Sequence, residues 1–226
     1  ISIDILGRII EVVSGQKLDD FFKDNIFKPL NMIDTDFYVP EDKHHRFVDC
    51  YQELVSKTGN KLKRCYKGGE DIFSKKRNFL SGGGGLCSTL ADYANFCQMI
   101  LNEGYFDGKQ LLSPITVRFM RENHLPNNQT MSEMGDDNFS EVRYDGAGFG
   151  LGFSSLIDPV KSMSPLSTGS ISWGGMASTF FWIDPKENLF SILLTQLIPS
   201  GRYPIRPQAQ TLVYSALSEL NKNTRL

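Results

Sequence analysis

The hydrophobic residues in the first part of the chain recur at the spacing of helices. The apolar positions from Ile5 to Val13 predict a helix that ends at Ser14-Gly15, because glycine takes the left-handed conformation after a helix without strain. A second helix is expected over residues 18–27, with Pro29 ending it. Asn31 follows in a compact loop and is predicted to be left-handed.

Two further helices are marked by their starts. Thr89 with Asp92 three positions later resembles a capping box and predicts a helix through residue 101. Ser113-Pro114 predicts another helix to about residue 120, with serine as the N-cap and proline in the first turn. An amphipathic pattern predicts a last helix over residues 206–220.

Alternating patterns predict the strands. Residues 51–55 and 61–66 are expected to form a hairpin with its turn at 56–60, and residues 126–146 a polar surface excursion. Single strands are predicted over 149–157, 170–183 and 189–196, the last two joined by a turn at 184–188. We therefore predict an α+β fold with an antiparallel sheet flanked by helices. Residues 1–146 should be mainly helical with one hairpin, and residues 147–226 should contain the sheet strands and a C-terminal helix.

Composition and charge narrow the function classes. Of 226 residues, 40% are hydrophobic and 22% charged, which is ordinary for a globular protein, and no apolar run reaches the ~20 residues of a membrane span. The net charge of -2 gives no overall attraction to nucleic acid, so neither a nucleic-acid partner nor a membrane span is expected. A local basic run is interpreted as the solvated surface of the hairpin; its members are Lys57, Lys61, Lys63, Arg64, Lys67, Lys75, Lys76 and Arg77.

Neither cysteine nor histidine spacing predicts a metal site. The four cysteines show no C-x-x-C pair, so we expect no metal and no cofactor. Cysteines without a regular spacing are interpreted as free thiols, which favours a reducing compartment such as the cytoplasm. The histidines lie in polar loop or helix-end sequence and are interpreted as surface residues rather than catalytic ones. They are His44, His45 and His124.

Two short motifs of serine β-lactamases and penicillin-binding proteins occur in this sequence, but not in the secondary structure that their catalytic roles require. Ser14-Gly15-Gln16-Lys17 reads S-x-x-K, but the helix is predicted to end at Ser14, so Lys17 cannot face the hydroxyl one helical turn later. Lys57-Thr58-Gly59 reads K-T-G, but it lies in a predicted hairpin turn instead of on a strand. We interpret both matches as coincidental.

Two glycine-rich segments remain as candidates. Residues 82–85 are four glycines without the P-loop lysine, and we interpret them as close packing of a helix start against a sheet, the alternative being that they border a substrate cleft. Gly174-Gly175 lies inside a predicted strand, where glycine implies the close approach of another group. A backbone N–H beside it can serve as an oxyanion donor, and the alternative is a bulge in the sheet.

The order of several weak motifs resembles that of the serine β-lactamase-like family, which includes class C β-lactamases, penicillin-binding proteins, D-aminopeptidases and carboxypeptidases, and family VIII-type esterases. The resemblance covers nearly the whole chain. It rests on Leu6-Gly7, Pro29-Leu30-Asn31-Met32, Asp34-Thr35, Phe37, residues 82–89, 106–114 and 149–153, and Trp173-Gly174-Gly175.

The resemblance implies acyl transfer through a serine activated by lysine and tyrosine, and it also implies what this chain lacks. In the family, S-x-x-K lies well upstream, and the Tyr of Y-x-N would fall roughly two positions before Ile1. The first residues are already in a helical pattern without an initiator Met. We therefore expect a C-terminal part whose N-terminal strands and nucleophile helix are missing, and whose partner is that N-terminal segment.

The resemblance also assigns site residues. Trp173-Gly174-Gly175 matches K-T-G with Trp for Lys and Gly for Thr, as in the esterase branch, and Met176 is the expected oxyanion-hole N–H donor. Loss of the lysine weakens a penicillin-directed interpretation, and the expected substrate is a small ester or amide. The alternatives are a non-catalytic binding protein, an inactive fragment, or a true β-lactamase or D-peptidase.

Overall fold

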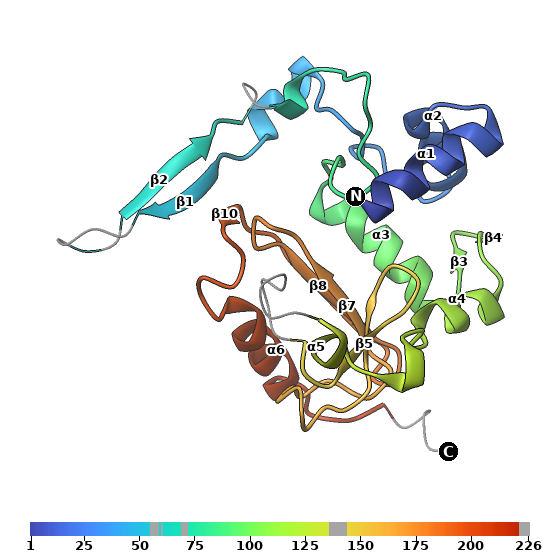
Figure 1. The fold of residues 1–226 in the computed structure, drawn as a ribbon, viewed down its shortest axis with the longest axis vertical. Coiled ribbons are helices and arrows are strands. Elements are labelled where there is room, and N and C mark those ends of the chain that lie inside the picture. Colours follow the sequence, from blue (N-terminus) through green and yellow to red (C-terminus); the bar gives the residue numbers. More distant parts are fainter. Residues whose placement is uncertain (55–58, 60, 69–71, 136–143, 222–226) are drawn as a thin grey trace. The chain divides into compact units, whose positions relative to one another are not determined.

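The computed structural model describes residues 1–54, 59, 61–68, 72–135 and 144–221 (Figure 1). The chain divides into two compact units, one of Ile1–Met99 with Phe106–Leu111 and one of Ile100–Tyr105 with Leu112–Leu226. No helix in the described ranges is long and apolar enough to cross a membrane.

The first unit begins with the two predicted helices. Helix α1 (Ser2–Ser14) ends at Gly15, whose φ of 70° confirms the left-handed stop. Helix α2 (Leu18–Phe22) continues into a π-helical turn, η1 (Lys23–Phe27). Asn31 has a φ of 54°, so its predicted left-handed conformation is confirmed.

The glycine-rich segment packs closely against backbone, as predicted, but against α1 and not against a sheet. A Cβ on Gly82 would lie 2.7 Å from the carbonyl oxygen of Ile3, so no side chain fits there. The Asp4 carboxylate on α1 accepts hydrogen bonds from the Ser81 hydroxyl at 2.6 Å and the Gly83 N–H at 3.1 Å. The loop and the helix therefore hold each other in place.

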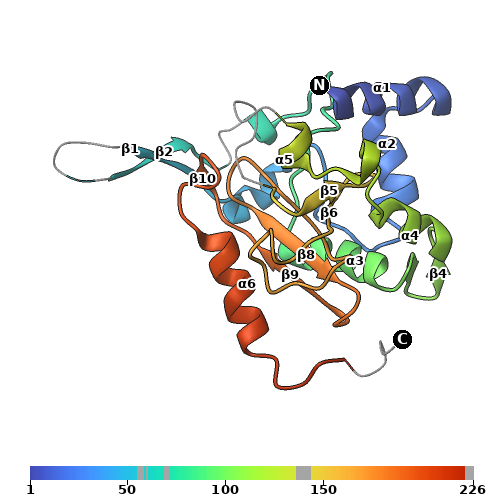
Figure 2. The ribbon, with the colours of Figure 1, turned by 60° about the horizontal axis from the view of Figure 1, so that its bottom comes forward.

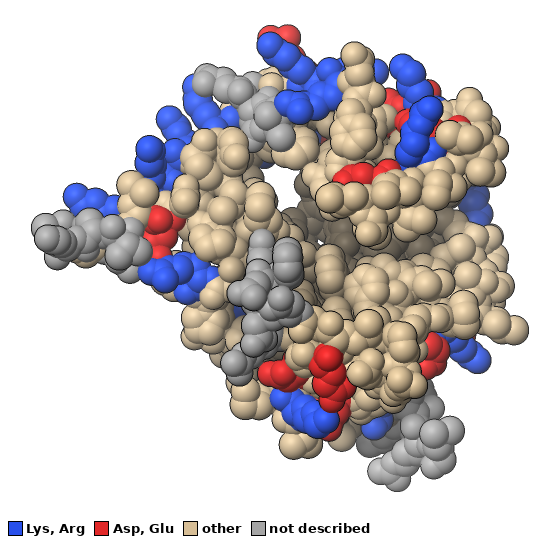
Figure 3. Space-filling model, viewed as in Figure 1, with Lys and Arg blue, Asp and Glu red and all other residues tan. Residues whose placement is uncertain are grey.

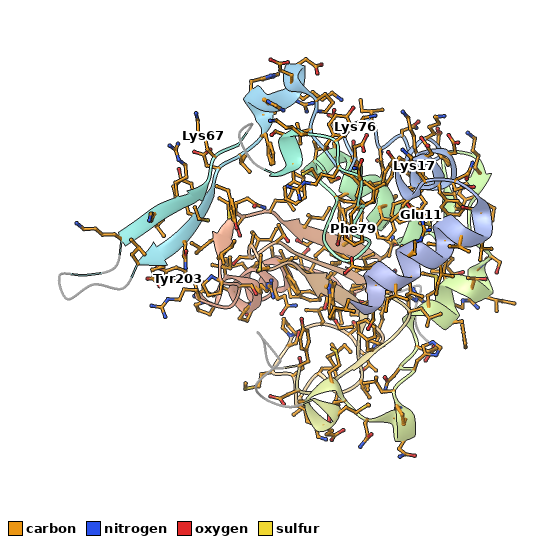
Figure 4. The ribbon with its side chains drawn as sticks, turned by 45° about the horizontal axis from the view of Figure 1, so that its top comes forward. Glu11, Lys17, Lys67, Lys76, Phe79 and Tyr203 are labelled. Carbon is orange, nitrogen blue, oxygen red and sulfur yellow. The ribbon has the colours of Figure 1, made fainter. Side chains whose placement is uncertain are left out.

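The predicted hairpin is present as β1 (Cys50–Leu54) and β2 (Lys61–Tyr66), which pair antiparallel. Lys57 and Thr58 of its turn lie outside the described residues. Lysine and arginine side chains gather around this hairpin (Figure 3), and Lys67 extends from the end of β2 (Figure 4). Nearby, the Lys76 ammonium lies 5.1 Å from the ring centre of Tyr38.

Helix α3 (Leu90–Leu101) begins at Thr89, whose hydroxyl accepts the Asp92 N–H at 3.2 Å. Half of the predicted capping box is therefore present. The Asp92 carboxylate instead bonds the Asp34 N–H at 2.7 Å and the Thr35 hydroxyl at 2.8 Å, tying the loop after α2 to the helix. The first unit also contains the short helices η2 (Glu41–Arg46) and η3 (Ile72–Ser74).

The second unit contains an antiparallel sheet of five strands in chain order (Figure 2). The predicted single strands over 149–157 and 170–183 are wrong, because each is a hairpin. An alternating pattern does not reveal where the chain folds back, since both arms share it. The strands are β5 (Ala147–Phe149), β6 (Ser154–Leu156), β7 (Ile171–Gly174), β8 (Phe180–Asp184) and β9 (Leu189–Leu193).

The other elements are short. The Ser113 hydroxyl accepts the Thr116 N–H, which confirms the N-cap of α4. A short helix within residues 126–146 was not predicted, although Thr130 and Glu133 form a capping box there. The bounds are β3 (Tyr105–Phe106), β4 (Lys109–Gln110), α4 (Pro114–Arg121), η4 (Pro126–Asn128), α5 (Met131–Met134), β10 (Leu197–Ile198) and α6 (Ile205–Ser215).

Helix α6 covers one face of the five-stranded sheet (Figure 2). Trp182 on β8 is fully buried in a cluster with Leu156 and Leu166, and Val213 and Tyr214 of α6 pack against it. The helix ends at residue 215, five residues earlier than predicted. This packing fixes the helix beside the β7–β8 hairpin, where the candidate site lies.

Candidate active site

The candidate residues Trp173 to Met176 lie at the end of β7 and in the turn to β8. The Gly175 N–H donates to the Thr179 carbonyl at 3.0 Å, and the Ser178 N–H donates to the Gly175 carbonyl at 3.1 Å. Ser178 has a φ of 66°. A tight turn followed by a left-handed residue is a common three-residue hairpin loop, here Met176 to Ser178.

This turn leaves the Met176 N–H available. Within the described part of the chain, the N–H groups of Met176 and Ala177 donate no hydrogen bond, whereas those of Gly175 and Ser178 are both bonded. The Met176 residue is 59% exposed. An open backbone N–H at a turn can bind a developing negative charge, so Met176 remains the candidate oxyanion donor.

Arg206 of α6 holds the two ends of this turn. Its Nη2 atom donates to the carbonyl oxygens of Gly175 at 2.9 Å and Thr179 at 3.1 Å. The guanidinium lies 5.3 Å from the Phe180 ring centre, a cation–π contact in a buried setting. A Cβ on Gly174 would lie 2.6 Å from Nη2, so the predicted close approach of another group to this glycine is confirmed.

The far side of the turn is held by the chain after β9. The Ser178 hydroxyl donates to the Leu197 carbonyl at 2.7 Å, and the Leu197 N–H donates to the Ala177 carbonyl at 3.0 Å. The Thr195 hydroxyl donates to the Ser178 carbonyl at 3.0 Å. Hydrogen bonds from two directions therefore fix the backbone of the turn.

Trp173 lies among aromatic rings. Tyr144 stacks on it with ring centres 5.6 Å apart and an angle of 11° between the planes, and Phe149 meets it edge-on at 5.2 Å. Neither contact could be predicted from the sequence pattern, since both pairs join segments that are far apart along the chain. At the position that the motif order equates with lysine, the structure has an apolar aromatic cluster.

The other candidates lack catalytic geometry. Ser14 ends α1, and Lys17 precedes α2 on the other side of Gly15, so the helical face that S-x-x-K needs is absent, as predicted. Burial raises the pKa of the Cys97 thiol to about 12, which removes it as a nucleophile at neutral pH. None of the four cysteines is in a disulfide, and no metal-binding cluster occurs among the described residues.

The histidines hydrogen-bond local backbone carbonyls. His44 bonds Val39 at 2.8 Å and His45, which is exposed, bonds Asp42 at 2.9 Å. His124 is exposed and bonds the Phe119 carbonyl at 2.7 Å. These short-range bonds agree with the surface role expected for them.

The motif order agrees with a comparison against protein families. The family model described as Beta-lactamase matches residues 1–214. The chain belongs to the beta-lactamase family. Protein Rv1367c of Mycobacterium tuberculosis is 32% identical over 201 residues, covering 88% of this chain and 48% of that protein. Lovastatin esterase of Penicillium rubens is 28% identical over 212 residues, covering 87% and 49%.

Solved structures of the family share the fold. EstCE1, a hydrolase with promiscuous acyltransferase activity, matches with a TM-score of 0.73 and 25% identity over 94% of this chain and 54% of that one. Simvastatin synthase (LovD) from Aspergillus terreus matches in fold with a TM-score of 0.74 and 22% identity, over 96% and 55%. The chain thus spans about half the length of the relatives it matches. The family includes hydrolases and acyltransferases, and this chain shares their α+β fold.

Proposed function

We propose that this chain is the C-terminal part of a serine hydrolase that acts by acyl transfer and prefers esters to β-lactams. The observation that carries the proposal is the aromatic setting of Trp173 immediately before a turn with an open Met176 N–H. The similarity to an esterase and to a hydrolase with acyltransferase activity supports the same choice.

In the proposed reaction, a serine hydroxyl from the remainder of the protein attacks the ester carbonyl, and its proton passes to the lysine–tyrosine pair. The carbonyl oxygen becomes an oxyanion, which the Met176 N–H binds. Collapse of this intermediate releases the alcohol, which takes up the proton. Water then hydrolyses the acyl-enzyme by the same steps. The partners are therefore a small ester or amide and the N-terminal segment of the same protein.

Trp173 is the proposed determinant of the substrate class. A lysine in this place would offer a positively charged donor to the carboxylate of a β-lactam, whereas Trp173 has only a neutral indole N–H. Its indole instead offers apolar surface, and burial of apolar area is worth about 25 cal/mol per Å². An uncharged acyl group is the better match.

The test uses the full-length protein that contains this chain. We expect a higher kcat/KM for p-nitrophenyl butyrate than for nitrocefin, and we expect Trp173→Lys to shift the ratio toward nitrocefin. Trp173→Phe is the matched control, since it keeps an aromatic ring and adds no charge. The esterase assignment is wrong if nitrocefin is the better substrate by tenfold or more. An unchanged ratio in Trp173→Lys would show that the motif alignment is misplaced.

A protein that turns over neither substrate would agree with a non-catalytic binding role. The sequence upstream of Ile1 separates the two cases independently of any assay. An S-x-x-K motif and a tyrosine just before Ile1 support the enzyme, and their absence supports the binding protein.

A further inference from the structure

The peptide group between Gly175 and Met176 has its two polar atoms on opposite edges. A trans peptide is planar, so its carbonyl oxygen and its N–H point in opposite directions. The Gly175 oxygen faces the protein interior, where it accepts hydrogen bonds from Arg206 at 2.9 Å and from the Ser178 N–H at 3.1 Å. The Met176 N–H therefore points away from Arg206.

We propose that Arg206 is a positioning residue for acyl transfer, which sets the direction and strength of the Met176 N–H through the shared peptide group. This inference rests on the proposed function, since it assumes that Met176 binds the oxyanion. The guanidinium itself does not touch the substrate. It acts from the opposite edge of the peptide.

The direction is set because Arg206 bonds both ends of the turn. One Nη2 atom reaches the carbonyls of Gly175 and Thr179, which lie on either side of the three-residue loop. Rotation of the Gly175–Met176 peptide would break the first of these bonds and the bond from Ser178 together. The N–H is thereby held in one orientation before the substrate arrives, which is what oxyanion binding requires.

The strength is set by the charge. Arginine stays protonated, and its guanidinium is buried, where electrostatic interactions are less screened than in water. The positive guanidinium is hydrogen-bonded to the Gly175 carbonyl oxygen and draws electron density toward that oxygen through the peptide group. The Met176 N–H thereby becomes a stronger hydrogen-bond donor. Gly174 makes this contact possible, because a Cβ there would lie only 2.6 Å from Nη2.

The kinetic test compares Arg206→Met and Arg206→Lys in the full-length protein, with Arg118→Met as the control. Arg118 is an exposed arginine of the same unit that pairs with Glu103 at 2.8 Å. Loss of a whole oxyanion donor costs about 10²–10³ in kcat, so loss of its support should cost about 10–100-fold. We expect this loss in kcat for Arg206→Met, a KM within about twofold, and the same loss in affinity for a boronic acid transition-state analogue.

Arg206→Lys should recover part of the kcat, because it restores a charge with a single amine, and Arg118→Met should match the unmutated enzyme. A merely structural role would lower the melting temperature and the fraction of active protein, but kcat expressed per active site, counted by burst titration, would match the unmutated value. A folded Arg206→Met enzyme whose kcat stays within twofold of the unmutated value overturns the proposal.

A second measurement does not depend on activity. Selective ¹⁵N labelling of methionine in the full-length protein gives amide signals that include those of the seven methionines of this chain, and the signal lost in Met176→Leu identifies Met176. We expect the Met176 amide proton to move upfield in Arg206→Lys and Arg206→Met while the other methionine signals stay, since a weaker donor is less deshielded. An unmoved signal in the folded Arg206→Lys chain overturns the proposal.

The two proposals fail differently. If the unmutated full-length protein hydrolyses no ester, the proposed function is wrong, while the amide signal still shows whether Arg206 controls the peptide. If the enzyme is active and neither kcat nor the amide signal responds to Arg206, only the positioning role is wrong.

Discussion

The hydroxyl of Tyr214 on α6 donates a 2.6 Å hydrogen bond to Oδ2 of Asp184, whose side chain is fully buried at the end of β8. The same carboxylate accepts the N–H groups of Ser167, Lys186 and Glu187. Burial, and then the hydrogen bond to Asp184, raises the pKa of Tyr214 well above its usual value, so it remains a donor. This bond ties the helix that carries Arg206 to the sheet.

Tyr214→Phe should lower the free energy of unfolding by about 1–3 kcal/mol, because it leaves a buried carboxylate oxygen with one donor fewer. Urea titration followed by circular dichroism measures the change. Tyr105→Phe is the control, since Tyr105 is 46% exposed in the same unit, and it should stay within about 0.5 kcal/mol. Equal stability of both variants would contradict the prediction.

Gly174→Ala should destabilise the protein by about 1–3 kcal/mol, as added atoms do in packed sites. The new Cβ would lie 2.6 Å from Nη2 of Arg206 and 2.9 Å from the Thr179 carbonyl oxygen, so the guanidinium must move. Thermal unfolding measures the loss. Gly84→Ala serves as the comparison, because nothing lies within 4 Å of its Cβ position. A neutral Gly174→Ala would show that Arg206 has room to move.

Asp34 should make the stability depend on pH in the acid range. Hydrogen bonds from Arg46 at 2.8 Å and Lys43 at 2.6 Å hold the pKa of its carboxyl well below the usual value. A lowered folded-state pKa contributes stability above the unfolded pKa of about 3.9, and this contribution is lost as the pH falls through the folded pKa. Asp34→Asn should therefore be less stable than the unmutated chain at pH 7, and the difference should shrink below about pH 4.

Urea midpoints of Asp34→Asn and the unmutated chain between pH 7 and pH 3 check this sign. Asp24→Asn is the control, since Asp24 forms an exposed ion pair with Lys28 four residues later, and such pairs contribute little. A gap between Asp34→Asn and the unmutated chain that widens in acid would refute the linkage.

The 226-residue chain by itself should show no serine-hydrolase activity. Its S-x-x-K match is split by the end of α1, so the Met176 donor would stabilise a charge that no nucleophile generates. Turnover of p-nitrophenyl butyrate by the purified chain checks this. Activity that Ser14→Ala abolishes would show that the motif is functional after all.

Local chemistry made several elements predictable. Gly15 ends α1 and Ser113 begins α4 because capping depends on a few neighbouring atoms. The turn after β8 was predicted from Asp184-Pro185, and the Asp184 carboxylate bonds the N–H groups of Lys186 and Glu187. The order of weak motifs pointed to the family, and the family match over residues 1–214 agrees with it.

The fold of the candidate site could be predicted only in part. The residues Trp173 to Met176 were identified from their motif, but the segment 170–183 was predicted as one strand and is two. Ser178 takes a left-handed conformation, which a serine in the sequence does not predict. Its hydroxyl donates a hydrogen bond to the carbonyl of Leu197, which lies 19 residues later in the chain. Long-range contacts of this kind leave no local pattern.

The sequence by itself determined the helices with clear caps, the sheet-forming segments and the family, because these follow from short-range preferences and motif order. Only the tertiary structure decided how the Met176 N–H is held. Arg206 lies 31 positions from Gly175 and Tyr144 lies 29 positions from Trp173, yet each touches its partner. Such contacts depend on how the helix and the loop pack on the sheet, and packing is a property of the whole folded unit.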